Sequence, residues 1–239
     1  MSSIDEKFLI RPAVASDSQF VSIGIREAER CHIGVGIYDV VIGQTLSQIS
    51  EREKPDDVSR YLEHALLQDP NSHVYIDNFL VVVDRENDQV AACCCSFPYP
   101  EFKLTTSKIG FANGLVEVLE YSKEKAEKAF EAWDFLDSAF PDVEYEHTWM
   151  IEAVYVSPAY RGQGLAQHII QANMDSQAHR KHLAADSTEP NRRYLITCAV
   201  GNEGARRVYE KVGFKLVGQG HSEECLRTIG CTGFYVLST

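Results

Sequence analysis

A glycine-rich turn holds the residues of this sequence whose types and spacing best suit ligand chemistry. It reads SPAYRGQGLA over residues 157–166 and lies between an apolar run and a segment with helical periodicity. A strand, a glycine turn and a helix start together direct backbone N–H groups and the positive end of the helix dipole at one point. Gly162 and Gly164 would let a ligand approach closely, and Arg161 would add positive charge. The turn predicts an anion site, with a turn that only packs the helix as the alternative.

Two common nucleotide loops do not fit this stretch. It lacks the Gly-Lys-Ser/Thr of a P-loop. A dinucleotide fingerprint that starts at Gly162 needs Gly or Ala at position 167, where Gln167 stands. The anion is therefore expected on another kind of ligand.

A carboxylate just before the turn could act as a base. Glu152 lies in the otherwise apolar run TWMIEAVYV, residues 148–156, and strict strand alternation places it on the face of Val154 and Val156. Ionised carboxylates are rarely buried without cause, and burial would raise the pKa of Glu152 towards a value useful for a base. The alternative is a glutamate in a salt bridge at a strand edge. Glu146 and His147, just before this run, are reserve candidates and are otherwise expected to be solvated loop residues.

Composition limits the classes of protein that these residues could serve. The chain has 239 residues, of which 44% are hydrophobic, enough for a real core. No basic start with an apolar run opens the sequence and no window is long and apolar enough for a membrane span, so we expect a cytoplasmic protein without a membrane partner. Seven cysteines, three of them consecutive at 93–95, favour reduced thiols over a disulfide framework. Cys225 and Cys231 lack a matching pair of ligands, so no metal is expected.

The charge of the chain argues against one class of partner. A formal net charge of -12 is unfavourable for nucleic acid, whose phosphates are bound by clustered Lys and Arg. A cationic partner or substrate is easier to accommodate. The Lys and Arg residues within 191–215 lie downstream of the glycine turn, where they could favour an anionic ligand.

The elements that position the turn follow from periodicity and turn residues. Predicted strands cover residues 8–14, 78–84, 89–97, 148–156, 194–200, 213–218 and 233–238. Predicted helices cover a segment from a cap at Ser16 or Asp17 to Cys31, then 37–50, 57–68, 115–140, a segment after the turn to His182, and 203–212. We expect a single α/β domain over residues 1–239 with a helical insertion near 104–147. The oligomeric state stays open, with a homodimer among the alternatives.

Three stretches together resemble the GNAT superfamily of N-acyltransferases. They are IRPAVASD, VYVSPAYRGQGLAQHII and VGNEGARRVYEKVGFKLVG, in matching order and spacing. The resemblance covers residues 8–32, 78–98 and 148–237, and in the Arg/Gln-x-x-Gly-x-Gly/Ala signature Gly164 and Ala166 fill the two small positions. It implies a mixed, mostly antiparallel twisted sheet flanked by helices, with splayed central strands.

The resemblance also implies an acyl-CoA groove. In such proteins the turn binds the pyrophosphate of acetyl-CoA through backbone N–H groups, and unpaired strand backbone receives the pantetheine arm. The implied cofactor-binding residues are Val154, Tyr155, Val156, Arg161, Gly162, Gln163, Gly164, Leu165, Ala166 and Asn202. Asn202 could equally be an ordinary helix cap, and the valines could be plain core residues.

The implied reaction is direct transfer of an acetyl group to a primary amine. Tyr209, one turn before Gly213 and Phe214, matches a tyrosine that protonates the departing thiolate in many members. Glu152 would accept the proton of the amine, and a strand N–H near Val154 would hold the oxyanion. Tyr209 could instead be a core aromatic, Cys198 is expected to be a small buried strand residue rather than a nucleophile, and Arg206 and Arg207 are expected to be solvated helix charges.

The acceptor and the alternative function depend on weaker signals. Glu117, Glu120, Glu124, Glu127, Glu131 and Asp134 recur at helical spacing. This acidic stripe is expected to be a solvated face, and the alternative is that it attracts a polyamine, another cationic small molecule or a lysine-bearing peptide. A non-catalytic acyl-CoA sensor on the same fold is the alternative to the enzyme.

Overall fold

A computed structural model describes residues 3–30, 32–42, 57–70, 72–99, 104–131, 136, 138–145, 148–175 and 193–239. These residues contain a seven-stranded sheet in the order β1-β2-β3-β4-β5-β7-β6. The strands are β1 (Phe8–Pro12), β2 (Phe79–Asp84), β3 (Val90–Tyr99), β4 (Thr148–Val156), β5 (Arg193–Ala199), β6 (Lys215–Gln219) and β7 (Phe234–Ser238). Only β4 and β5 run parallel, and the other neighbours are antiparallel, as predicted.

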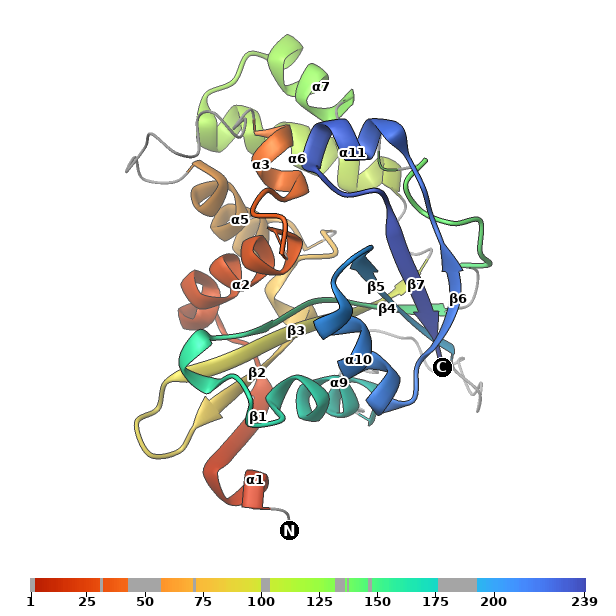
Figure 1. Ribbon diagram of the computed structural model, residues 1–239. Helices are drawn as coiled ribbons and strands as arrows, with labels where there is room; N and C mark the ends of the chain where they lie inside the picture. Colours follow the sequence, from red (N-terminus) through yellow and green to blue (C-terminus); the bar gives the residue numbers. More distant parts are fainter. Residues whose placement is uncertain are drawn as a thin grey trace, which may run out of the picture.

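Helices cover both faces of the sheet (Figure 1). They are α1 (Ser3–Lys7), α2 (Ser18–Arg30), α3 (Ile37–Val41), α5 (Asp57–Gln68), α6 (Leu104–Leu119), α7 (Lys123–Glu131), α9 (Leu165–Asp175), α10 (Glu203–Val212) and α11 (Glu223–Ile229). On one face α9 packs against β2, β3 and β4, and α10 packs beside it. On the other face α2 packs on β3 and β4, while α5 and α6 form further layers over α2.

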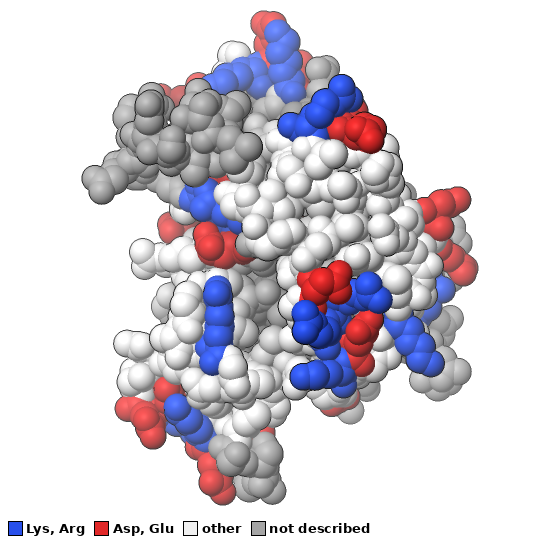
Figure 2. Space-filling view, in the orientation of Figure 1, with Lys and Arg blue, Asp and Glu red and all other residues white. Residues whose placement is uncertain are grey.

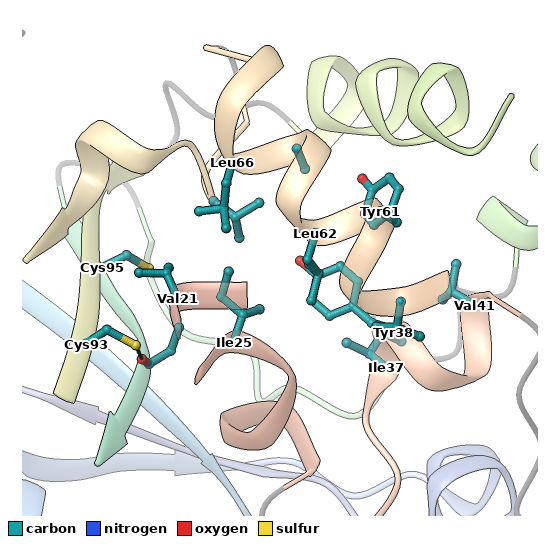
Figure 3. Packing of buried hydrophobic residues seen from close by; sticks show 14 of the residues in the cluster. Val21, Ile25, Ile37, Tyr38, Val41, Tyr61, Leu62, Leu66, Cys93 and Cys95 are labelled. Atoms are coloured by element: carbon teal, nitrogen blue, oxygen red, sulfur yellow. Dashed lines mark hydrogen bonds between the residues drawn. The ribbon is translucent and has the colours of Figure 1, made fainter. Parts of the chain in front are cut away.

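Two buried clusters separate along these faces. The larger cluster joins α2, α3 and α5 to β3. Val21 of α2 lies beside Cys93 and Cys95, and Ile25, one helical turn further on, lies on the side of Leu62 and Tyr38 (Figure 3). On α5 the predicted apolar stripe is buried: Val58, Tyr61, Leu62, Ala65 and Leu66. The second cluster lies under α9 and α10 and contains Ile151, Ile169 and Tyr209. Each side of the sheet therefore has its own core.

The parallel pair β4 and β5 separates after four residues. Thr148 to Ile151 pair with Arg193 to Ile196, and β4 then continues to Val156 without that neighbour. From Leu195 onwards β5 pairs with β7 on its other side. The sheet is thus open between the C-terminal halves of β4 and β5, as the predicted splay requires.

A bulge interrupts β4 directly after the predicted base. Cys95 pairs with Glu152 and Cys93 with Tyr155, so β4 has one extra residue at this point, and Ala153 has a φ of 51°. Met150 and Ala153 pack with the larger cluster, whereas Val154 and Val156 pack with the second. The prediction that Glu152 shares a face with Val154 and Val156 is therefore wrong, because the bulge breaks the alternation.

In the described part of the insertion, two separate helices, α6 and α7, lie where one long helical region was predicted over 115–140. Helix α6 ends at Leu119, Glu120 follows with a φ of 57°, and α7 begins at Lys123. The Ser122 side chain accepts the N–H of Lys125 at 3.2 Å, so it caps the second helix. The apolar periodicity continues across this break, which explains why it suggested a single helix.

Other elements differ from prediction mainly at their ends. Helix α2 begins after Asp17, whose carboxylate binds the Arg11 guanidinium and the N–H of Val14 instead of capping the helix. Helix α3 ends at Val41, with Ile42 as its C-cap, and α9 ends at Asp175. The two predicted helices were longer, and their remainders, from residues 43 and 176, lie outside the described residues. Two short helices, α1 and α11, were not predicted. Ser222, which caps α11, and Gly230, which ends it, were the available signals.

Candidate active site

One cavity of about 1250 Å³ passes through the opening between β4 and β5. Its wall includes Glu152 on the side of the larger cluster and Tyr209 on the side of the second cluster. Of the predicted site residues, only Gln163 is not part of the wall. The structure therefore brings the proposed base, the proposed acid and most of the glycine turn to a single cavity.

The glycine turn presents a row of backbone donors at one end of this cavity. Gly162 and Gly164 have φ of 78° and 80°, a conformation that favours glycine. Arg161 N–H bonds the carbonyl of Pro158 and His168 N–H bonds that of Gly164. Between them, the N–H groups of residues 162–167 donate to no acceptor among the described residues. These donors at the start of α9 fit a pyrophosphate.

The arginines near the turn have different partners. Arg161 lines the cavity, and its Nε donates to the carbonyl of Val156 at 3.1 Å. Arg206 pairs with Glu210 at 2.9 Å and lies over the ring of Tyr235. Arg207 Nε donates to the carbonyl of Glu203. Arg206 and Arg207 are thus engaged on the surface of α10, whereas Arg161 is available at the cavity.

Strand β4 contributes backbone to the cavity. Val154 and Val156 line it from the half of β4 that has no β5 partner. Tyr155 also lines it, and its ring lies 5.8 Å from that of Phe20 on α2. A peptide-like arm could therefore add to this strand as a further strand would.

Asn202 has a structural role in addition to its place at the cavity. Its Oδ1 accepts the N–H of Ala205 at 3.2 Å, which caps α10. The residue also lines the cavity. Both interpretations of the sequence are compatible, because the cap uses the amide oxygen and leaves the amide NH₂ for a ligand.

Tyr209 is held by the packing of α10. Its exposed fraction is 7%, and it lies in the cluster beneath α9 and α10. Its carbonyl accepts the N–H of Phe214 where Gly213 ends the helix with a φ of 114°. The helix end therefore fixes the backbone of Tyr209, while the side chain reaches the cavity wall.

Glu152 faces the opposite half of the cavity in an apolar setting. Its side chain is 29% exposed, and its Oε2 lies 3.9 Å from Nε2 of His73. Burial, with the nearby charge of Glu29 as a second cause, raises the pKa of Glu152 to about 8. Burial also lowers the pKa of His73 to about 4, so this histidine is neutral near pH 7 and gives Glu152 no counter-charge.

Glu29 is a second carboxylate of the cavity that sequence reasoning missed. It lies on α2 one turn beyond Ile25, on the buried stripe of that helix. Burial raises the pKa of Glu29 to about 7. An acidic residue at this position of an apolar stripe is the signal that could have revealed it.

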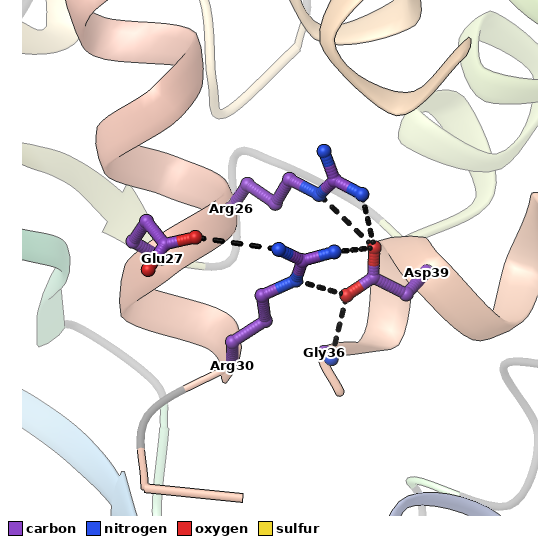
Figure 4. A network of polar contacts seen from close by, with 5 residues as sticks. All are labelled: Arg26, Glu27, Arg30, Gly36 and Asp39. Atoms are coloured by element: carbon purple, nitrogen blue, oxygen red, sulfur yellow. Dashed lines mark hydrogen bonds and ion pairs between the residues drawn. The ribbon is translucent and has the colours of Figure 1, made fainter. Parts of the chain in front are cut away.

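A polar network fixes the segment that carries Glu29. The carboxylate of Asp39 on α3 accepts from Arg26 and Arg30 of α2 and from the N–H of Gly36 (Figure 4). Asp39 is fully buried, and these contacts hold its pKa below its usual value against the effect of burial. Removing one partner of such a buried pair costs about 3–5 kcal/mol. The network joins α2, which carries Glu29, to α3, which carries Tyr38.

Aromatic side chains form much of the remaining wall around the two carboxylates. They are Tyr38, Tyr61, His73, Phe97, Tyr99, Phe140, Tyr145 and Phe234. Phe140 and Tyr145 show that the end of the insertion borders the cavity. The acidic stripe does not: Glu117, Glu120, Glu124 and Glu127 are exposed and absent from the wall. Asp134, the side chain of Glu131, Glu146 and His147 lie outside the described part of the chain.

Charged side chains of both signs alternate on the face shown in Figure 2. Over α10 the positive and negative side chains are neighbours, as in the pair of Arg206 and Glu210.

Among the described residues no cluster of His, Cys, Asp and Glu could hold a metal ion, and no helix is long and apolar enough to cross a membrane.

Comparison with known proteins identifies the family. The model of the acetyltransferase (GNAT) family matches residues 43–214. A search of curated proteins finds no match. The chain belongs to the GNAT family, and the protein is an acyltransferase.

Solved structures of acetyltransferases share the fold. An N-acetyltransferase from Staphylococcus aureus Mu50 is 19% identical with a TM-score of 0.59, over 97% of this chain and 100% of the other. A GCN5-related N-acetyltransferase from Kribbella flavida is 14% identical with a TM-score of 0.50, over 98% of each chain. At this identity the likeness concerns the fold alone.

Proposed function

We propose that the protein transfers an acetyl group from acetyl-CoA to a primary amine by direct attack in a ternary complex. One observation carries this proposal. A single cavity connects the free N–H groups of the glycine turn with Glu152 on one side of the opened sheet and Tyr209 on the other. The two partners of an acyl transfer can therefore meet between β4 and β5.

Acetyl-CoA is proposed to lie along the half of the cavity near α9 and α10. Its pyrophosphate accepts from the N–H groups of residues 162–167, with charge from Arg161. Its pantetheine arm lies along Val154 to Val156, and the amide NH₂ of Asn202 is a further donor. The thioester then lies at the bulge, between the two halves of the cavity.

Glu152 is proposed to prepare the amine. An alkyl amine has a pKa near 10 and arrives mainly as ammonium, so it must lose a proton before it attacks. The carboxylate of Glu152 takes that proton, and the amine nitrogen forms a bond to the acetyl carbonyl carbon. A backbone N–H near Val154 stabilises the oxyanion of the tetrahedral intermediate.

Tyr209 is proposed to complete the reaction. The intermediate collapses as the carbon–sulfur bond breaks, and the Tyr209 hydroxyl donates a proton to the departing thiolate. The nitrogen loses its second proton to solvent, and Tyr209 recovers one. The products are an N-acetyl amine and coenzyme A with a free thiol.

The setting of this activity is proposed to be the cytoplasm. The described cysteines are buried thiols that form no disulfide: Cys93, Cys94, Cys95, Cys198, Cys225 and Cys231. Thiols of this kind are typical of a reducing compartment. Cys198 is a small buried strand residue at the cavity wall, and direct transfer requires no nucleophile from it.

Calorimetry with acetyl-CoA, followed by a panel of primary amines monitored for free thiol, tests the proposal. We expect saturable binding of acetyl-CoA and release of thiol with at least one amine. Binding without turnover across the panel would instead favour a non-catalytic acyl-CoA sensor. Absence of binding would contradict both functions.

Glu152→Gln and Tyr209→Phe test the two catalytic roles. General acid or base groups contribute about 100-fold or more, so each variant is expected to lose at least that factor in kcat while it still binds acetyl-CoA. The control is Glu127→Gln, on the exposed face of α7. Rates within a few-fold of the parent would remove the roles assigned to Glu152 and Tyr209.

A further inference from the structure

Two carboxylates of the cavity come from different elements and face the same space. Glu29 is on α2 and Glu152 on β4, and both line the half of the cavity opposite Tyr209. Tyr38 lines the same cavity, and after burial the charges of both glutamates are among the causes that raise the pKa of its hydroxyl. The charge of Glu29 also raises the pKa of Glu152. The two groups are therefore near enough to interact electrostatically.

The described part of the chain supplies no cation to either carboxylate. Among the described residues Glu29 has no hydrogen bond or ion pair, and the arginines of its own helix are directed to Asp39 and, in the case of Arg30, also to Glu27. The neighbour of Glu152 is His73, which burial keeps neutral. Both carboxylates are only partly exposed, and carboxylates withdrawn from water are normally paired, so both are poised for a cation from outside the chain.

The space between the two groups suits hydrocarbon. Tyr38, Tyr61 and Phe97 belong to the buried cluster and form part of this wall. The cationic lining residues Arg161 and Lys211 belong to the turn before α9 and to the last turn of α10. The acceptor half thus offers two carboxyl groups within a largely aromatic wall.

We propose that the acceptor is a diamine with a short hydrocarbon linker, whose reacting nitrogen meets Glu152 while its second ammonium group is held by Glu29. This inference rests on the proposed function and assigns its substrate class. The aromatic rings contact the linker and can contribute cation–π attraction to the ammonium groups. A monoamine of the same length leaves Glu29 without a partner.

Matched acceptors provide the test in turnover. Diamines from 1,3-diaminopropane to 1,6-diaminohexane are compared with amino alcohols of equal length, in which a hydroxyl replaces one amine. We expect the best diamine to exceed its amino alcohol at least 10-fold in kcat/KM. Glu29→Gln should abolish this preference by raising KM for the diamine, whereas Glu127→Gln should retain the preference.

Binding without turnover gives a second readout. In the presence of coenzyme A, which has no acetyl group to transfer, calorimetry in buffers of different ionisation enthalpy measures the protons released on acceptor binding. Since the pKa values of Glu29 and Glu152 are raised to about 7 and 8, a dication should release more protons at pH 7 than an amino alcohol does. Glu29→Gln should remove the excess, and melting temperatures establish that the variant is folded.

The outcomes separate this inference from the proposed function. Acetylation of amino alcohols as fast as diamines, unaffected by Glu29→Gln, would overturn the diamine assignment and leave acetyl transfer intact. Diamine binding that depends on Glu29 without any acetylation would support the ligand assignment and overturn the catalytic proposal. Equal proton release by both acceptors would also overturn the role of Glu29.

Discussion

At the scale of residues, the proposed site separates acid and base chemistry by face of the sheet. Glu152 belongs with His73 and Tyr38 on one side, while Tyr209 packs beneath α9 and α10 on the other. In the proposed mechanism Glu152 can therefore take a proton from the amine on one side while Tyr209 gives a proton to the thiolate on the other, and the two groups do not compete for the same partner. The bulge at Ala153 produces this separation, because it directs Glu152 and Val154 to opposite faces.

The pH dependence of kcat/KM should show the ionisation of the Glu152 carboxyl group. Because the pKa of this group in the free protein is raised to about 8, kcat/KM is expected to rise with pH through that region as the carboxyl group loses its proton. Since the acceptor is proposed to bind as ammonium, deprotonation of the free amine near its own pKa is expected to lower kcat/KM again at higher pH. The profile is measured at saturating acetyl-CoA with the best acceptor.

Glu29→Gln should move this acid limb to lower pH, because the variant lacks a negative charge that raises the pKa of Glu152. The other groups near Glu152 are His73, neutral above about pH 4, and the Tyr38 and Cys95 side chains, whose pKa values burial raises. None of them gains or loses charge near pH 8. An unchanged limb in Glu29→Gln would contradict the coupling of the two carboxylates.

At the scale of elements, the glycine turn supplies its donors only in a left-handed conformation. Gly162→Ala imposes strain at a φ of 78° and places a methyl group in the open space above the turn, where no described atom lies within 4 Å. Gly34→Ala is a matched control, since Gly34 has a φ of 87°, equally open surroundings and no place in the cavity wall. Left-handed backbone costs a non-glycine residue about 1–2 kcal/mol, so both variants should lose similar stability.

Only Gly162→Ala should weaken acetyl-CoA binding, by about 10-fold if roughly 1.4 kcal/mol of interaction is lost. Calorimetry gives Kd, and urea unfolding gives the stability of each variant. Equal affinity of Gly162→Ala and the parent would argue against pyrophosphate binding at this turn.

Periodicity predicted most of the elements and the mixed sheet, but not the details that shape the site. The strands near Phe79, Val90 and Thr148 and the stripe of α5 were confirmed because alternation and helical spacing are local properties. The bulge at Ala153 was missed, since it depends on the pairing of β4 with β3, which the order of residue types does not encode. The break after α6 was missed because apolar periodicity continues across Glu120.

The candidate site was predictable to the extent that its residues are close in sequence to a recognisable turn. Most of the turn and the neighbouring β4 residues line the cavity. Asn202, the cap of α10, and Tyr209 within α10 line it as well. Glu29 was not predicted because it reaches the site only through the packing of α2 over β4, a contact between segments far apart in the chain. The paired carboxylates therefore required the three-dimensional structure.

At the scale of the whole molecule, two sets of carboxylates affect the stability of the fold, and their effects depend on pH in opposite ways. Asp17 and Asp39 are bound by arginines, and these contacts hold their pKa values below the usual range. They stabilise the fold at pH values above about 4, the pKa of an aspartate in the unfolded chain. This contribution is lost as the pH falls through the lower pKa values that they have in the folded protein. Glu29 and Glu152 have raised pKa values, so their contribution is present below about pH 4.5 and is lost as the pH rises through 7 and 8. Stability of the free protein should therefore decline between pH 5 and 8.5.

The double variant Glu29→Gln/Glu152→Gln should flatten that decline, because neutral amides do not have to ionise in the cavity. Each kcal/mol changes the Tm by about 2–4 °C in a chain of this size, so the difference is measurable by scanning calorimetry at pH 5, 7 and 8.5. Glu127→Gln should keep the slope of the parent. A diamine bound with coenzyme A should raise the parent's Tm more at pH 8.5 than at pH 5, since it pairs the two charges that form between those values. A parallel decline in the parent and the double variant would show that the two carboxylates ionise in the folded protein as readily as in water, and would remove the electrostatic basis for a dicationic acceptor.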